Sequence, residues 1–231
     1  MDRLQILKKS SFFSSVPEPT QREISRLFME EKYERDDYIF FEGDLPEWFH
    51  IVKEGKAKLV KHSDSGKDVI LQVYVPGDMF GEASLFDRKP YAASAQAMEP
   101  SVILKLARKD FFLFFSRHPF VATEVIMELG RQLRDAHSTI KSLAVDRVEQ
   151  RIASILLKLA AKLGVPAKEG ILLDLSITRQ DLADMAGTTV ETTIRVMSRF
   201  TKTKILKPAS GKILILDRKA LEQISEGKEN P

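Results

Sequence analysis

The pattern of hydrophobic and polar positions divides the chain into a β-rich part and a helical part. Residues 15–29 are expected to form a short helix that begins near Ser15. Between Tyr38 and about Leu106 the hydrophobic runs are short and rich in β-branched and aromatic residues, and glycine- and aspartate-containing turns separate them. Such runs predict an all-β barrel or jelly roll. The runs are YIFF, WFHIV, AKLV, DVILQVYV and SVILKL, and the turns are EGD, KEG, SDSGKD and PGD.

A long helix is expected after Pro119, as far as about Leu143. Its hydrophobic positions are alternately four and three residues apart, which makes a heptad seam. A seam this narrow favours a coiled coil of two identical helices, and hence a homodimer; a single amphipathic helix packed on its own barrel is the alternative. The seam is Ala122, Ile126, Leu129, Leu133, Ala136, Ile140 and Leu143, and the last six form the predicted dimer interface. Charged residues between them are expected on a solvated outer face: Glu128, Arg131, Arg134, Asp135 and Lys141.

The C-terminal part has the order of a helix-turn-helix followed by a β wing. Residues 145–163 predict an amphipathic helix, and the strand ILLDLSI follows it. Two short helices, TRQDLADMA and TTVETTIRVMSRF, then stand on either side of Gly187, and KPASGKILIL supplies a turn and a strand. Thr178 can cap the first helix, and Thr188 or Thr189 the second. Five residues are expected to pack the two helices together: Leu182, Ala183, Ala186, Ile194 and Met197.

Polar side chains at the start of the second short helix suit recognition of DNA bases. Glu191 and Arg195 are four residues apart, so they share a helix face, and Thr192 follows Glu191 directly. Arginine can donate two hydrogen bonds to guanine, and glutamate can accept one from the cytosine amino group. The alternative is an ordinary surface ion pair. The capped helix, the glycine turn and the wing favour a helix that enters the major groove.

The charge is unevenly distributed along the chain. Residues 1–144 carry 21 basic and 22 acidic side chains (net −1), and residues 145–231 carry 15 and 11 (net +4). Segment 195–212 has six basic residues and no acidic one, and Lys202 and Lys212 are among them. A basic segment beside a base-reading helix predicts contacts with DNA phosphates.

Composition and motifs exclude several classes of protein. The chain has no cysteine, which rules out disulfides, thiolate metal sites and cysteine nucleophiles. We find no nucleophile–base motif, phosphate-binding loop or metal-ligand spacing, so the protein is not expected to be an enzyme. No hydrophobic run reaches the length of a membrane span. We therefore expect a cytoplasmic protein without a membrane partner.

Two motifs resemble those of the CRP/FNR superfamily of transcription regulators. PGDMFGEASLFDRKPYAASAQA is similar to the effector-pocket signature of that family, and TRQDLADMAGTTVETTIRVMSRF is similar to its helix-turn-helix. The resemblance implies an α+β protein with an effector-sensing, cyclic-nucleotide-binding-type β-barrel (1–118), a dimerisation helix (119–144) and a winged helix-turn-helix (145–231). It further implies a homodimer that binds an inverted repeat of double-stranded DNA, with RNA polymerase as a further partner.

The resemblance assigns roles within the helix-turn-helix. Arg179 corresponds to an arginine that contacts a phosphate or a base, and Glu191 and Arg195 correspond to the main base-reading positions. Val190 before the glutamate is typical of the FNR branch, whereas Ile194 departs from that branch, which commonly has serine there. The predicted DNA-binding residues are Arg179, Thr188, Thr189, Glu191, Thr192, Arg195, Lys202 and Lys212.

The effector pocket departs further from the cyclic-AMP-binding members of the family. Gly81 and Glu82 correspond to the glycine and glutamate that face the phosphate and ribose, but Tyr91 stands where those members have an arginine. A buried phosphate needs a matching cation or several donors, so cAMP is not the expected effector, and the effector or cofactor is unknown. The predicted pocket is Gly81, Glu82, Ala83, Tyr91, Ala92, Ala136 and His137.

Two other functions remain as alternatives. Some family members hold haem between barrel and helix, and His137 on the long helix is the best candidate ligand. His62 and His118 are expected at the surface, and His50 lies in a strand where it can face inward or outward. No motif supports haem. A signalling module that does not bind DNA is the second alternative, and the recognition face and wing argue against it.

Overall fold

The computed structural model describes residues 2–10, 12–63 and 67–228. The chain forms two compact units, Met1–Asp135 and Ala136–Pro231, and the boundary between them falls within one helix, α5 (Val121–Val145). Each unit is described by itself. The division into 1–118, 119–144 and 145–231 stays a prediction.

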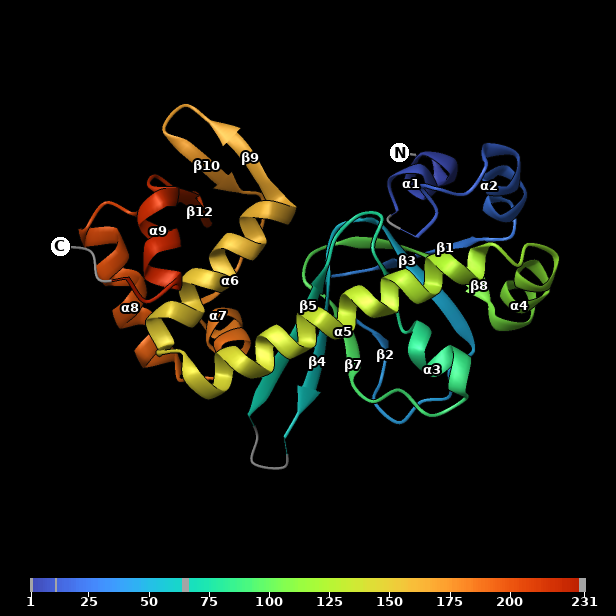
Figure 1. Cartoon of the computed structure of the whole chain (residues 1–231), viewed down its shortest axis with the longest axis horizontal. Helices are drawn as coiled ribbons and strands as arrows, with labels where there is room; N and C mark the ends of the chain where they lie inside the picture. Colours follow the sequence, from blue (N-terminus) through green and yellow to red (C-terminus); the bar gives the residue numbers. More distant parts are fainter. Residues whose placement is uncertain (1, 11, 64–66, 229–231) are drawn as a thin grey trace. The chain divides into compact units, whose positions relative to one another are not determined.

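Two four-stranded antiparallel sheets form the centre of the first unit (Figure 1). Their strand orders are β1-β8-β3-β6 and β2-β7-β4-β5, which is the predicted jelly-roll sandwich. We call the hydrophobic side chains between the two sheets the inner cluster; it has members on all eight strands. The strands are β1 (Met29–Tyr33), β2 (Tyr38–Phe40), β3 (Trp48–Glu54), β4 (Ala57–His62), β5 (Asp68–Tyr74), β6 (Met79–Phe80), β7 (Ser94–Ala97) and β8 (Ser101–Ala107). The predicted turn SDSGKD includes residues 64–66, which lie outside the described residues.

Both faces of the β1-β8-β3-β6 sheet are covered. Along β3, Val52 joins the inner cluster, whereas Phe49 and Ile51 lie on the outer face, as the alternation of a strand requires. Helices cover that outer face, and the ring of Phe111 stacks on Phe49 with centroids 4.7 Å apart. Val121 and Val125 of α5 pack on the same face. We call the hydrophobic cluster between this face and the helices the outer core. The other helices of this unit are α1 (Arg3–Lys9), α2 (Glu18–Ser25), α3 (Glu82–Asp87) and α4 (Arg108–Arg117).

The expectation for residues 15–29 is wrong in extent. The helix is only α2, with Pro17 at its N-cap, and Met29 already begins strand β1. Four of the five β1 side chains are exposed, so the segment has no alternating hydrophobic pattern that would mark it as a strand. Its pairing with β8 makes it one. Helices α1 and α3 and strands β6 and β7 were not predicted either.

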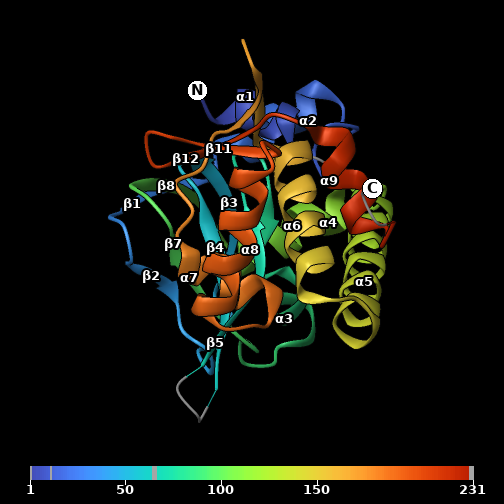
Figure 2. The ribbon, with the colours of Figure 1, turned by 90° about the vertical axis from the view of Figure 1, so that its left-hand side faces the viewer.

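The second unit is a winged helix domain, and Figure 2 brings α7, α8 and the hairpin of β11 and β12 towards the viewer. Its four-stranded antiparallel sheet has the order β11-β12-β10-β9. The helix predicted over 145–163 is α6: it ends at Leu163 as expected, but it begins at Val148, because Val145 still belongs to α5. Strand β9 and helix α9 were not predicted. The elements are α6 (Val148–Leu163), β9 (Gly164–Ala167), β10 (Gly170–Leu173), α7 (Arg179–Ala186), α8 (Val190–Lys202), β11 (Leu206–Ala209), β12 (Lys212–Ile215) and α9 (Arg218–Ser225).

Gly187 makes the turn between α7 and α8. Its φ of 59° is left-handed, and the N–H groups of Gly187 and Thr188 both donate to the carbonyl of Ala183. A Cβ at Gly187 would lie 3.1 Å from Leu143 Cδ2. The left-handed residue therefore ends α7 and lets α8 start in a new direction.

We expect Gly187→Ala to lower the free energy of unfolding by about 1–2 kcal/mol, because L-residues other than asparagine and aspartate avoid this backbone region. Gly187→Asn adds the same Cβ but tolerates the conformation, so its loss is expected to be smaller. Urea denaturation followed by circular dichroism measures both. Equal losses would mean that the contact with Leu143, and not the backbone conformation, carries the effect.

Candidate functional site

Side-chain caps fix the start of both helices of the helix-turn-helix. Thr178 Oγ1 accepts from the Asp181 N–H at 3.0 Å and donates to Asp181 Oδ2 at 2.6 Å. Thr189, and not Thr188, caps α8, since its Oγ1 accepts from the Thr192 N–H at 3.3 Å. These caps satisfy N–H groups that would otherwise lack partners at the helix ends. The first turns of α8 are thereby set in a defined position.

The first two turns of α8 present Glu191, Thr192 and Arg195 together. Glu191 and Arg195 are exposed, and Arg195 Nη2 donates to Thr192 Oγ1 at 3.1 Å. The backbone N–H of Glu191 and the Thr189 side chain hold the pKa of the Glu191 carboxyl below its ordinary value, and the charge of Arg195 acts in the same direction. An ionised carboxylate therefore stands beside a guanidinium that Thr192 orients, so one helix face offers both an acceptor and a bidentate donor.

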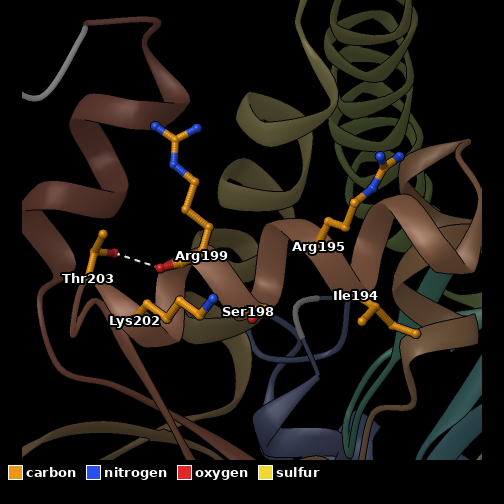
Figure 3. Close-up of a pocket in the computed structure, with 6 residues that line it drawn as sticks. All are labelled: Ile194, Arg195, Ser198, Arg199, Lys202 and Thr203. Atoms are coloured by element: carbon orange, nitrogen blue, oxygen red, sulfur yellow. Dashed lines mark hydrogen bonds between the residues drawn. The ribbon is translucent and has the colours of Figure 1, made fainter.

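An open hollow of about 550 Å³ extends this face along α8 (Figure 3). In Figure 3, Ile194 and Arg195 lie at one end and Lys202 and Thr203 at the other. The expectation that Ile194 packs α7 against α8 is wrong, because its side chain is 50% exposed. The lining residues are Ile194, Arg195, Ser198, Arg199, Lys202 and Thr203.

The remaining charged residues predicted to contact DNA differ in how accessible they are. Lys212, at the start of β12 in the wing, forms an ion pair with Asp174. Arg179 is half-buried at the start of α7, and burial lowers the pKa of its guanidinium below the ordinary value. Lys202 is exposed near the end of α8. Of the two lysines expected to contact phosphate, Lys202 is thus the more accessible.

Two arginines that the sequence analysis missed tie α6 to the helix-turn-helix. Arg151 Nε donates to the Ala186 carbonyl and its Nη1 to the Asp146 carbonyl, both at 2.8 Å. Arg199 Nη1 lies 3.0 Å from Glu149 Oε2. The arginine side chains thus link α6 to the end of α7 and to α8. The excess of basic residues in the C-terminal part predicted contacts with DNA. No pattern in the sequence indicated that Arg151 and Arg199 bind other elements of this unit.

Aromatic rings fill the inner cluster beside Gly81. Tyr91 is buried and stacks on Phe40, with ring centroids 3.7 Å apart and planes at 13°. Tyr91 Oη donates to the Trp48 carbonyl at 3.3 Å. A Cβ at Gly81 would lie 3.1 Å from Tyr91 Cε1 and 3.3 Å from Phe40 Cε1. The two rings therefore pack directly against the backbone of Gly81.

The carboxyl of Glu82 is buried and linked to α5. It accepts a hydrogen bond from Gln132 Nε2 at 2.7 Å, and the same nitrogen lies 3.3 Å from Glu128 Oε1. Glu128 in turn pairs with Arg131. Burial raises the pKa of the Glu82 carboxyl above its ordinary value. The placement of Glu128 on a solvated outer face is wrong: its side chain is 7% exposed, and it shares the amide of Gln132 with the buried Glu82.

The structure brings together only part of the predicted effector pocket. Gly81, Glu82 and Tyr91 lie at the inner cluster, whereas Ala83 and Ala92 are exposed. The Ala92 carbonyl accepts a hydrogen bond from Lys61 Nζ at 2.9 Å. Ala136 and His137 are exposed on the part of α5 that belongs to the second unit.

The four histidines differ in their surroundings. His62 Nδ1 lies 2.7 Å from Asp68 Oδ1, and His118 Nε2 lies 3.3 Å from Glu23 Oε2, so both are engaged by surface carboxylates.

His50 faces inward and stacks on Phe80 at 5.1 Å between centroids, and burial lowers its pKa to about 3. Its Nδ1 has no hydrogen-bond partner among the described residues. His137 is exposed. Packing thus explains the position of His50, and carboxylates engage His62 and His118. Haem binding stays an alternative.

The seam of α5 is exposed over most of its length. The exposed fractions are 68% for Ile126, 57% for Leu133 and 64% for Ile140, which are spaced by seven residues. Leu129 is partly buried against the outer core of the first unit, while Ala136 and Leu143 are exposed. At its start, α5 therefore packs one face on the first unit. The hydrophobic side chains of most of the seam stay exposed.

The described residues contain neither a membrane-spanning helix nor a cluster of metal ligands. None of the helices in ranges 2–10, 12–63 and 67–228 is long and apolar enough to span a bilayer. In the same ranges, no group of three or more histidine, aspartate or glutamate side chains could hold a metal ion.

Comparisons with known proteins agree with both units. The model of the cyclic nucleotide-binding domain matches residues 30–118, and that of the Crp-like helix-turn-helix domain matches residues 150–224. The cyclic AMP receptor protein of Thermus thermophilus is 31% identical over 216 residues, which cover 94% of this chain and 96% of that protein. The anaerobic regulatory protein of Bacillus subtilis is 27% identical over 81% of this chain and 79% of that protein.

Solved structures show the same fold. FixK2 from Bradyrhizobium japonicum superposes with a TM-score of 0.77 at 23% identity, covering 85% of this chain and 96% of that chain. The catabolite activator protein of Thermus thermophilus has a TM-score of 0.54 at 30% identity and covers 95% and 100%. Two domain matches in the predicted order, together with a relative that aligns almost from end to end, show that the chain belongs to the CRP/FNR superfamily of transcription regulators, whose members bind DNA through a helix-turn-helix domain and are not enzymes.

Proposed function

We propose that the protein is a homodimer that binds an inverted repeat of double-stranded DNA, with one α8 in the major groove of each half-site. The observation that carries the proposal is the exposed face of α8, where Glu191 and Arg195 stand together on a capped helix. The guanidinium of Arg195 can donate to guanine O6 and N7, while the carboxylate of Glu191 accepts from cytosine. The pair reads a G·C base pair in each half-site.

The exposed seam of α5 supports the dimer. Hydrophobic side chains at every seventh position, such as Ile126, Leu133 and Ile140, pack efficiently when an identical helix lies alongside. Two identical subunits related by a twofold axis present two identical DNA-binding surfaces. An inverted repeat is the DNA sequence that has the same symmetry. RNA polymerase is the further partner of such a regulator once it is bound at a promoter.

We further propose that the effector is not cAMP. A cyclic phosphate that enters the sandwich loses its water and needs a charged partner there. Tyr91 instead offers a neutral ring that stacks on Phe40, and its hydroxyl already donates to Trp48. Relatives are named for different signals, among them a cyclic AMP receptor protein, an anaerobic regulatory protein and a global nitrogen regulator. The packed rings suit a small uncharged ligand or a dimer that binds DNA without one.

Titration calorimetry and fluorescence anisotropy test this proposal. The ligand-free dimer is expected to select an inverted repeat from a random DNA library and to bind it equally well with and without cAMP. The cAMP-binding members have an arginine where this chain has Tyr91 and hydroxyl side chains where it has Ala92 and Ala136. Without that charged hydrogen bond and those two hydroxyl contacts, cAMP binding is expected to be at least about a hundredfold weaker. The cyclic AMP receptor protein of Thermus thermophilus serves as the positive control in the same titration. A low-micromolar dissociation constant, with tighter DNA binding on addition of cAMP, would sink the idea.

A further inference from the structure

Ile194 is an exposed hydrophobic residue in the middle of a polar helix face. Its side chain is 50% exposed, while Met197 and Phe200 of the same helix are 2% and 0% exposed. Among the residues of α8, all of which the structure describes, Ile194 is the only large hydrophobic one that is exposed. The core of the second unit therefore does not account for an isoleucine at this position.

The surroundings of Ile194 favour a nucleic acid as the group that covers it. Ile194 follows Glu191 by three residues and therefore shares its helix face, and it lines the same hollow as Arg195. The hollow that it lines also contains Arg195, Arg199 and Lys202 and no acidic side chain. Glu149 neutralises one of these cations, Arg199, at 3.0 Å. A hydrophobic side chain flanked by cations fits a surface that is apolar at one point and anionic around it.

We infer that Ile194 contacts the C5-methyl group of a thymine next to the base pair that Arg195 reads, and thereby makes a T·A pair part of the half-site. This inference rests on the proposed DNA binding and makes it more specific. Thymine alone among the four DNA bases presents a methyl group in the major groove. A serine could bond to the polar edge of any base, whereas isoleucine offers no donor or acceptor.

Isoleucine also excludes other bases at that position. A cytosine amino group or a purine edge that faced Ile194 would lose water without gaining a hydrogen bond, which is unfavourable. Specificity then has an attractive component from the thymine methyl and a repulsive one from the alternatives. The contact is expected next to the G·C pair that Arg195 and Glu191 read. It therefore sets the base preference at one position of each half-site.

The test removes single methyl groups from the DNA. Each thymine of the selected half-site is replaced in turn by deoxyuracil, which differs only in lacking that methyl, and affinity is measured by fluorescence anisotropy. At one position the affinity is expected to fall about fourfold per half-site, and about tenfold or more when both half-sites are changed. At that position 5-methylcytosine is expected to bind better than cytosine.

Protein variants identify Ile194 as the residue responsible. Ile194→Ser is expected to bind the thymine and deoxyuracil sites equally, whereas Ile194→Val keeps most of the difference. Val165→Ser is the matched control, because Val165 is 47% exposed in the same unit but lies on β9; it should discriminate as the parent protein does. Persistence of the deoxyuracil effect in Ile194→Ser would overturn the inference.

The outcomes also separate this inference from the proposed function. Tight binding to an inverted repeat with no deoxyuracil-sensitive position overturns the role of Ile194 and leaves DNA recognition by Arg195 and Glu191 intact. Failure to bind any DNA sequence selectively overturns both.

Discussion

Replacing Leu133 with aspartate is expected to convert the dimer into monomers and to abolish tight binding to an inverted repeat. Leu133 lies at the centre of the exposed seam of α5, seven residues from both Ile126 and Ile140. In a two-helix seam the change would bury two unpaired carboxylates, one from each subunit, at a cost of several kcal/mol (roughly 3–5). A monomer also loses the gain from engaging two half-sites at once, which is roughly 10²–10⁴-fold in affinity.

Ser138→Asp is the control for this change. Ser138 is exposed on the same helix, five residues after Leu133 and off the seam, so it adds the same charge at a place that no partner helix covers. Sedimentation velocity should give a dimer for Ser138→Asp and a monomer for Leu133→Asp, with equal helicity by circular dichroism. A dimeric Leu133→Asp variant would show that the seam is not the interface.

The features that the sequence predicted well are those that depend on nearby residues. The cap at Thr178 with Asp181 is confirmed because both groups lie within one helical turn. Gly187 is confirmed as the left-handed turn residue because the backbone itself requires that conformation. The helix-turn-helix was therefore predictable in order and position, and so was the end of α6 at Leu163.

Features that depend on distant parts of the chain were missed. Glu128 lies among charged residues and resembles a surface position, yet Gln132 links it to Glu82 of α3. Strand β1 has a polar sequence and becomes a strand only because β8 pairs with it. Glu82 and strand β8, which decide these two cases, lie far away in the sequence, so a local pattern could not reveal the contacts.

The interior beside Gly81 shows the same limit. The sequence indicated that Tyr91 replaces a cation, since a motif fixes its position. It could not show that Phe40, from another strand, stacks on Tyr91 and packs against Gly81. The expectation about cAMP rested on missing polar partners, and the proposal has a further argument in the aromatic side chains that occupy this interior.

Arg195→Ala is expected to weaken binding to the selected inverted repeat by about 1–3 kcal/mol per half-site and to remove the preference for G·C at one position. The guanidinium of Arg195 is exposed, with a single hydrogen bond to Thr192 at 3.1 Å, so it can donate two hydrogen bonds to guanine. If the two half-sites contribute independently, the dimer loses about 2–6 kcal/mol. Anisotropy titrations with the selected site and with sites changed at each base pair measure both effects.

Lys202→Ala is the matched comparison, because Lys202 is exposed on the same helix face but near its C-terminal end. A lysine that contacts a phosphate carries no sequence information, so its loss should weaken binding to every sequence alike and reduce the salt dependence by about one counterion per half-site. Lys212 is less suitable, since its replacement would also leave the carboxylate of Asp174 without its cation. If Arg195→Ala and Lys202→Ala lost affinity equally for all sequences, Arg195 would be a phosphate contact and base reading would have to come from other residues of α8.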